Sequence, residues 1–205
     1  MNTIATDGRT TRWEEHNANR RRELVQETLR AIRRRGAGIG MDELATEAGT
    51  SKTVFYRHFG DRAGVYHAVC EAVHDFILRN LPLDEDIDPA GLVRQLADSY
   101  LALVERDPEI YQFVLNRPSG VIDDPVVGIT TRIGNAVSEA MGSWLRREGL
   151  DDSPANTWGH GVVGFVYAVA DRWIITRLRR PRADVVAFIA QLFDPAFSSQ
   201  TRSQR

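Results

Sequence analysis

Apolar residues recur every three or four positions through nearly all of this 205-residue chain. That spacing places them along one face of an α-helix. Alternation with a period of two, which marks a half-buried strand, is absent. The sequence therefore predicts an all-α protein with about nine helices.

Capping and stop signals set the limits of these helices. Gly36 ends the first, Ser51 and Asp61 are suited to cap the third and fourth, and Pro181 interrupts the eighth. The predicted ranges are about 17–35, 41–48, 51–59, 61–81, 89–106, 108–116, 125–148, 154–180 and 183–197.

A change in composition separates an N-terminal head from a larger body. Residues 82–91, PLDEDIDPAG, contain two prolines, four acids and a glycine. Such a run interrupts helices and marks a domain boundary. We therefore expect a helical head over 17–81, a helical body over 82–197, and disordered tails over 1–16 and 198–205.

Charge and cysteine content restrict the classes of function. Residues 1–62 carry 12 Lys and Arg against 9 Asp and Glu, a net charge of +3, and residues 63–205 carry 14 against 19, a net charge of −5. A basic head on an acidic body fits a protein that meets phosphate at one end. Cys70 is the only cysteine, which excludes an internal disulfide and suits a reducing cytoplasm. No apolar run approaches the roughly 20 residues that span a bilayer, so we expect a cytoplasmic protein without a membrane partner.

Residues 36–62 carry the most specific local pattern. A short helical pattern ends at Ala48, Gly49 permits a left-handed turn, and a second short helix begins at Ser51 and closes on an aromatic cluster. Two short helices joined in this way are typical of a helix-turn-helix, whose second helix enters the major groove of DNA. The motif covers about 39–58.

Polar side chains on and after this second helix are of the types that contact DNA. Hydroxyls and one amine at its start can reach base edges and phosphates, and donors near its far end can reach phosphates. The candidates are Thr50, Ser51, Lys52, Thr53, Tyr56, His58 and Arg62. Phe55 and Phe59 are expected to be core aromatics instead.

With its flanking helices, this segment resembles the N-terminal domain of the TetR family of bacterial transcriptional regulators over about 17–70. The matching residues are Gly36, Leu44, Ala45, Ala48, Gly49, Thr50, Ser51, Tyr56, Arg57, His58, Phe59 and Arg62. Two positions depart from the family pattern. Gly40 stands where the family usually has a Thr or Ser cap, which weakens that cap, and Ile32 stands where it often has Phe.

The resemblance implies a ligand-responsive transcriptional regulator, most often a repressor. A homodimer would read a palindromic operator in double-stranded DNA, and a small-molecule effector in the body would change the spacing of the two heads. The resemblance makes Thr50, Lys52 and Thr53 the base readers and Tyr56, His58 and Arg62 the phosphate anchors. No catalytic motif accompanies it, so we expect neither enzyme activity nor a cofactor.

The body carries weaker signals. Few charges lie on its apolar faces, which favours a lipophilic effector. The stretch RDPEIYQFVLNRP, followed by WGHGVVGFVYAVADRWI, looks similar to the bodies of actinobacterial members of the family tied to lipid and acyl-CoA metabolism. Residues expected to line the effector site are Tyr100, Leu103, Tyr111, Phe113, Met141, Trp144 and Phe165. The last two helices are the expected dimer interface. Its expected residues are Gly161, Gly164, Ala168, Phe188 and Leu192.

Three other interpretations compete with this one. A DNA-binding architectural or nucleoid protein on the same fold would need no ligand. An enzyme would use residues 159–164, GHGVVG, as a dinucleotide site with Asp184 downstream, but no strand precedes that segment. His67, Glu71 and His74 share one helix face at metal-ligand spacing, although no fourth ligand is evident.

Overall fold

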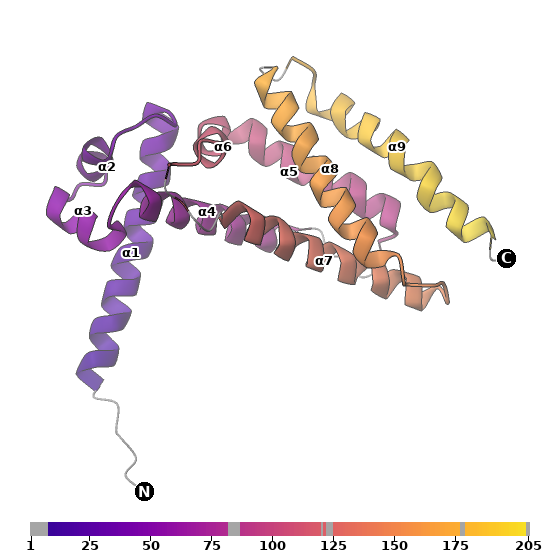
Figure 1. Cartoon of the computed structure of the whole chain (residues 1–205), viewed down its shortest axis with the longest axis horizontal. Coiled ribbons are helices and arrows are strands. Elements are labelled where there is room, and N and C mark those ends of the chain that lie inside the picture. Colours follow the sequence, from indigo (N-terminus) through magenta and orange to yellow (C-terminus); the bar gives the residue numbers. More distant parts are fainter. Residues whose placement is uncertain (1–7, 82–86, 120, 122–124, 177–178, 204–205) are drawn as a thin grey trace, which may run out of the picture. The chain divides into compact units, whose positions relative to one another are not determined.

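The structure, a computed structural model, describes residues 8–81, 87–119, 121, 125–176 and 179–203. Within these residues the chain forms nine α-helices and no strand (Figure 1), which confirms the predicted all-α class. The helices are α1 (Gly8–Arg35), α2 (Met41–Glu47), α3 (Lys52–Phe59), α4 (Arg62–Arg79), α5 (Pro89–Arg106), α6 (Pro108–Leu115), α7 (Pro125–Arg147), α8 (Ala155–Ile175) and α9 (Arg182–Ser203).

Three helix ends differ from the predicted ones. α1 begins at Gly8 rather than near residue 17, and α9 continues to Ser203 rather than ending near residue 197. The tails expected over 1–16 and 198–205 are therefore partly helical; residues 1–7 and 204–205 lie outside the described residues. Apolar periodicity fades in both segments, but a polar stretch without a breaker can still continue a helix.

The third difference concerns the end of α8, which was expected near residue 180. The helix ends at Ile175, and the backbone N–H of Thr176 donates to the carbonyls of Arg172 and Ile174. The Trp173 indole then donates to the carbonyl of Arg180 over 2.9 Å. This bond anchors the connection to α9, so a proline at 181 was not needed to stop the helix.

Contacts divide the chain into two units. The first contains Met1–Ala72 and Glu109–Ile122, and the second contains Val73–Pro108 and Asp123–Arg205. The division falls inside α4, and it places most of α6 with the N-terminal helices, whereas the sequence pattern placed 108–116 in the body. Residues 82–86 of the expected boundary lie outside the described residues.

The first unit has a core drawn from each of its helices. Leu24 and Ile32 of α1, Leu44 of α2 and Phe55 of α3 are fully buried. α6 also packs against this core. The Tyr66 hydroxyl donates to the carbonyl of Val114 over 3.0 Å, the Tyr66 and Phe113 rings lie 6.3 Å apart, and a Glu109 carboxylate oxygen accepts the Ala37 N–H over 3.0 Å.

In the second unit, α7 and α8 cross at very short range. A Cβ built on Gly159 would lie 2.3 Å from the Ser138 hydroxyl oxygen and 2.6 Å from the Ser138 backbone nitrogen. Only a residue without a side chain allows two helix backbones to approach this closely. Ser138 uses its hydroxyl to donate to the Gly134 carbonyl over 2.7 Å.

α9 is held by α5 and α8. Arg94 of α5 pairs with Asp194 at 2.8 Å, and Arg182 pairs with Asp98 at 3.0 Å. Aromatic rings bridge α8 and α9: Phe165 to Phe193 at 5.2 Å and Trp158 to Phe197 at 5.3 Å. Among the helices of the described chain, none is long and apolar enough to cross a membrane.

Candidate nucleic-acid interface

The turn between α2 and α3 is built from the residues that predicted it. Gly49 has a φ of +63°, the left-handed conformation that glycine adopts without strain. The Ser51 hydroxyl caps α3 by accepting the N–H of Val54 over 3.3 Å. Gly40 provides no side-chain cap for α2, as expected, and a carboxylate oxygen of Glu43 accepts the Gly40 N–H over 3.0 Å instead.

α3 presents one apolar and one polar face. Phe55 is fully buried and Phe59 is 6% exposed, with ring centroids 4.7 Å apart, which confirms both as core aromatics. Lys52, Thr53 and Tyr56 lie on the exposed side, where Tyr56 is 41% exposed. A large exposed aromatic that carries a hydroxyl at the end of a polar helix face is a suitable donor to phosphate.

Ion pairs connect α2 to its neighbours. Glu47 binds both Arg34 and Arg35 of α1, and the hydrogen bond from Arg35 holds the pKa of the Glu47 carboxyl below its ordinary value. The Lys52 ammonium lies 2.5 Å from a carboxylate oxygen of Asp42. The base reader expected at the start of α3 is therefore paired with an acid on α2.

His58 lies in an arginine-rich environment. Its ring is half-buried, and its Nε2 atom is buried without a hydrogen-bond partner among the described residues. Burial lowers the pKa of His58, and the charges of Arg57, Arg20 and Arg21 lower it further. The lowered pKa favours the neutral ring, and an approaching anion would favour its protonation.

Arg62 has a different role from the expected one. Its guanidinium donates to the carbonyls of Ala37 and Ile39, lies 4.6 Å from the centroid of the Phe113 ring, and is partly buried. Burial lowers the pKa of Arg62. Because both terminal nitrogens of the guanidinium already donate to backbone carbonyls and the group is partly buried, we do not retain Arg62 as a phosphate anchor. Carbonyl and phosphate oxygens attract the same donors, and the sequence alone could not separate them.

The other residues expected to contact DNA all lie in the first unit, but they differ in how exposed they are and in whether their polar groups are already used. Lys52, Thr53 and Tyr56 are exposed, Thr50 is half-buried, and the hydroxyl of Ser51 is used by its cap. The arginines of α1 beside His58 were missed as candidates. The signal was present in the sequence as the run Arg20–Arg22 on the polar face of the first predicted helix.

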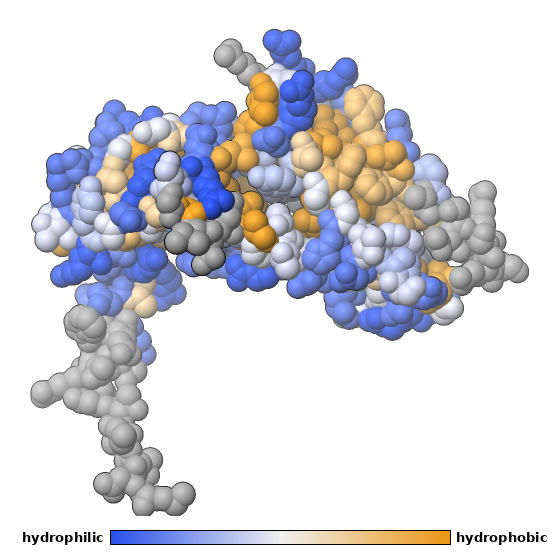
Figure 2. All heavy atoms as spheres, in the orientation of Figure 1, coloured by the Kyte–Doolittle hydropathy of each residue, from blue (hydrophilic) through white to orange (hydrophobic). Residues whose placement is uncertain are grey.

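The residues expected at a dimer interface lie on the surface of α8 and α9. Gly161, Gly164 and Ala168 are exposed, and a Cβ on either glycine would meet nothing within 4 Å. Phe188 is 51% and Leu192 is 58% exposed. Figure 2 shows hydrophobic side chains gathered over these two helices.

The residues expected to line an effector site are divided between the two units. Tyr111 and Phe113 belong to the first unit and the other five to the second. Phe113 is 1% exposed and Met141 is fully buried, so both belong to packed interiors. Aromatic and apolar side chains serve cores and pocket walls equally, which is why the pattern could not distinguish them.

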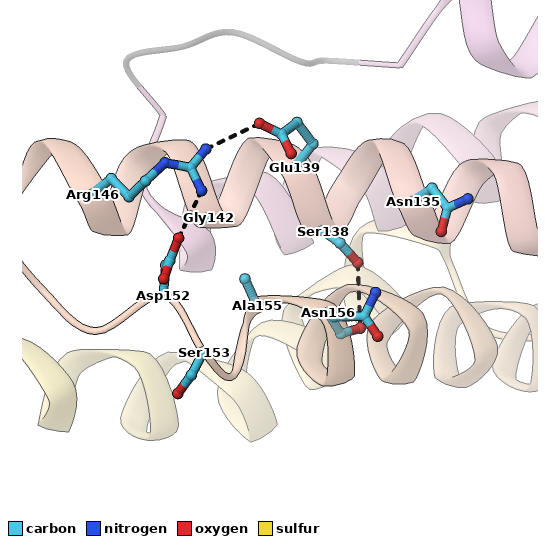
Figure 3. A pocket seen from close by; sticks show the side chains of 9 residues that line it. All are labelled: Asn135, Ser138, Glu139, Gly142, Arg146, Asp152, Ser153, Ala155 and Asn156. Atoms are coloured by element: carbon cyan, nitrogen blue, oxygen red, sulfur yellow. Dashed lines mark hydrogen bonds and ion pairs between the residues drawn. The ribbon is translucent and has the colours of Figure 1, made fainter.

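A polar pocket of about 340 Å³ lies between α7 and the start of α8, and none of those seven residues lines it (Figure 3). Arg146 lines it and pairs with Glu139 at 3.0 Å and with Asp152 at 2.7 Å. Its lining residues are Asn135, Ser138, Glu139, Gly142, Arg146, Asp152, Ser153, Ala155 and Asn156. With its one arginine neutralised by two acids, this pocket has no evident affinity for a lipophilic molecule.

The competing sites find no support in the geometry. Residues 159–164 lie within α8, where Gly159 packs against α7, so they do not form the strand-to-helix turn of a dinucleotide site. Across the residues that the structure describes, no group of three His, Cys, Asp or Glu side chains is arranged to hold a metal ion.

Comparison with known protein families identifies both halves of the chain. The model described as "Bacterial regulatory proteins, tetR family" matches residues 24–69, and the model described as "Tetracyclin repressor-like, C-terminal domain" matches residues 78–203. An HTH-type transcriptional regulator of Mycobacterium tuberculosis is 33% identical over 175 residues, which is 84% of this chain and 75% of that protein. The nucleoid occlusion factor SlmA of Shewanella pealeana is 30% identical over 123 residues, 58% of this chain and 59% of that protein.

Solved structures share the fold at low sequence identity. A tetR-family transcriptional regulator from Streptomyces coelicolor has a TM-score of 0.69 at 17% identity, and the match covers 91% of this chain and 84% of that protein's chain. FadR from Bacillus subtilis, in complex with stearoyl-CoA, has a TM-score of 0.67 at 11% identity and covers 83% and 95%. FadR from Thermus thermophilus, a repressor in complex with lauroyl-CoA, has a TM-score of 0.62 at 16% identity and covers 84% and 92%.

Proposed function

Because the chain belongs to the tetR family of bacterial regulatory proteins, it is a DNA-binding transcriptional regulator, and we propose that it is a repressor that binds a palindromic operator as a homodimer. One observation carries the DNA-binding part. The first unit fixes α3 by its buried phenylalanines and leaves Lys52, Thr53 and Tyr56 exposed on its outer face. A helix held in this way can enter a major groove without rearrangement.

The proposed contacts fall into two classes, those to base edges and those to phosphates. Lys52 and Thr53, with Thr50, lie at the N-terminal end of α3, where side chains of a recognition helix reach base edges. Tyr56 and His58 lie one to two turns later and suit phosphate contacts, which fix register but carry no sequence information. All of these interactions take place in the cytoplasm, where bacterial DNA is found.

The dimer is supported by the apolar surface of α8 and α9. Phe188, Leu192 and Ile175 are exposed on these helices, and a Cβ at Gly161 or Gly164 would meet nothing within 4 Å. Large apolar side chains exposed in this way are often covered by a partner. Two copies of this surface related by a twofold axis would form a four-helix bundle. That arrangement would present two recognition helices to the two halves of a palindrome.

We further propose that a small lipophilic molecule, of the acyl or acyl-CoA class, releases the protein from DNA. Two proteins of the same fold are in complex with stearoyl-CoA and lauroyl-CoA. A ligand shifts the equilibrium between DNA-bound and released protein only if it binds the two states with different affinity. A bound effector must therefore change the distance between the two DNA-binding heads of the dimer or the conformational order of one head. The arrangement of such a site in this chain is part of the proposal.

The DNA-binding proposal is tested by selection of duplexes from a random library with the purified full chain. We expect enrichment of an inverted repeat whose half-sites are about one helical turn apart. Enrichment of an asymmetric single site would contradict the dimeric reading, and enrichment of nothing would contradict operator binding. Light scattering on the same sample should give twice the monomer mass.

The effector proposal has a separate test. Native mass spectrometry followed by denaturing extraction should reveal a copurified acyl compound, and addition of acyl-CoA thioesters of graded length should release the enriched duplex. Protein that carries no such compound and is insensitive to each thioester would contradict it.

A ligand-independent nucleoid protein remains the second candidate because SlmA, a nucleoid occlusion factor, is 30% identical over part of the chain. The two candidates predict different chromosomal occupancy. A repressor occupies one or a few promoters, whereas a nucleoid protein occupies many sites and does not leave them when acyl compounds are added.

A further inference from the structure

α2 carries three acidic side chains, and each has a different partner. Glu43 accepts a backbone N–H at the start of its own helix, and Glu47 binds two arginines of α1. The first contact caps α2, and the second joins α2 to α1. Asp42 instead pairs with Lys52, the first residue of α3, with an Oδ2–Nζ distance of 2.5 Å.

The Asp42–Lys52 pair does little for the stability of the fold. The two side chains are 58% and 63% exposed, and exposed ion pairs of this kind contribute little to stability. Lys52 is a cation at the N-terminal end of a helix whose first turn contains no acid, a position that the helix dipole disfavours. Asp42 places a negative charge beside this end of the helix, and the ammonium lies against its carboxylate.

A carboxylate beside the ammonium affects two kinds of DNA contact differently. Phosphates lie along every duplex, and a lysine that reaches one must do so beside a group that repels it. Acceptors on base edges, such as O6 and N7 of guanine, lie in the groove and can replace Asp42 as partners only where the sequence provides them. Repulsion of the unwanted partner is a common source of specificity.

We propose that Asp42 is a specificity-determining residue: it holds the Lys52 ammonium away from phosphates, so that its transfer to DNA depends on base acceptors in the operator. This inference rests on the proposed DNA binding and adds to it the role of an acid on the helix that precedes the recognition helix.

The test is Asp42→Asn in the full chain. Dissociation constants are measured by fluorescence anisotropy on the duplex enriched by the wild type and on a scrambled duplex of equal length, over a series of salt concentrations. We expect affinity for the scrambled duplex to rise more, so that the specificity ratio falls about 5- to 20-fold, the range of a weak base contact. The salt slope on the scrambled duplex should steepen by about one, since one more cation reaches phosphate.

Glu43→Gln is the matched control. It removes the same charge one residue along, and its amide oxygen can still accept the N–H that Glu43 accepts. Both duplexes should then gain affinity alike, and the ratio should stay unchanged. If Asp42→Asn behaves like this control, or changes nothing, Asp42 acts only through general repulsion and the proposal is wrong.

A double variant distinguishes an effect of Asp42 that acts through Lys52 from direct reading of a base by Asp42. In a Lys52→Ala background, Asp42→Asn should no longer alter the specificity ratio. A ratio that still falls would show that Asp42 itself reads a base, which overturns the proposal. A wild-type protein that enriches no duplex would be a different result, since that outcome contradicts the proposed function itself.

Discussion

The crossing of α7 and α8 provides the sharpest prediction about stability. Gly159→Ala adds a Cβ that would lie 2.6 Å from the backbone nitrogen and 2.7 Å from the Cα of Ser138. Ordinary contact begins near 3.4 Å, so the α7 backbone must retreat by about 0.8 Å (3.4 minus 2.6). Backbone atoms cannot rotate out of the way, and the buried faces of both helices must separate with them.

The expected magnitude follows from two opposing effects. Replacement of glycine by alanine inside a helix stabilises it by about 1 kcal/mol, and overpacking of a well-filled interface costs about 1–3 kcal/mol, more when backbone must move. Because the clash involves backbone, we expect Gly159→Ala to lower the free energy of unfolding by about 1–2 kcal/mol. Removal of the Ser138 hydroxyl should not rescue it, since the nitrogen and Cα remain.

Gly128→Ala is the control for this experiment. Gly128 is an exposed residue of α7, and a Cβ there meets nothing within 4 Å. This variant should gain about 0.5–1 kcal/mol. Urea unfolding at one fixed protein concentration measures both variants, since the stability of the proposed dimer would depend on concentration. A Gly159→Ala protein as stable as the control would refute the close crossing.

Four further outcomes are expected. Tyr56→Phe should weaken binding to all duplexes alike in anisotropy measurements, and a loss at one base pair alone would contradict its phosphate role. Arg62→Met should destabilise the protein by about 2–3 kcal/mol in urea unfolding, because two backbone carbonyls lose a charged donor; unchanged stability would return Arg62 to the list of DNA contacts. The pKa of His58 is lowered in the folded state, so the unfolded chain binds more protons and stability should fall as pH drops below about 6.5, as seen in thermal melts, whereas His58→Gln should remove this dependence. Gly164→Leu should give a monomeric mass in light scattering, and a dimer would place the interface elsewhere.

The sequence predicted the helices because apolar periodicity and caps are local signals. Gly36, Gly49 and Ser51 have the conformations or caps that their residue types suggested. The start of α1 was missed because its first turns have no apolar stripe, and the end of α9 for the same reason. Local signals also could not show that Glu109 and the rest of α6 pack on the first unit, since that contact joins residues 72 positions apart.

Side-chain roles were less predictable than positions. Arg62 has the same donors whether it contacts a phosphate or two carbonyls, and only the fold decides between them. The pairing of Lys52 with Asp42 joins residues ten positions apart across a turn. Neither residue type shows that the two side chains meet, since the contact depends on how α2 and α3 pack.

The attachment of α6 to the N-terminal helices has a consequence for gene recombination. A crossover after α4 would transfer the DNA-reading helices without Glu109 and Phe113, which complete their core from a later part of the chain. A chimaera made there would receive from its new host an α6 with different partners for Tyr66 and Ala37. Exchange of operator preference between relatives should therefore succeed more often when two separate segments, 1–72 and 109–122, are grafted together.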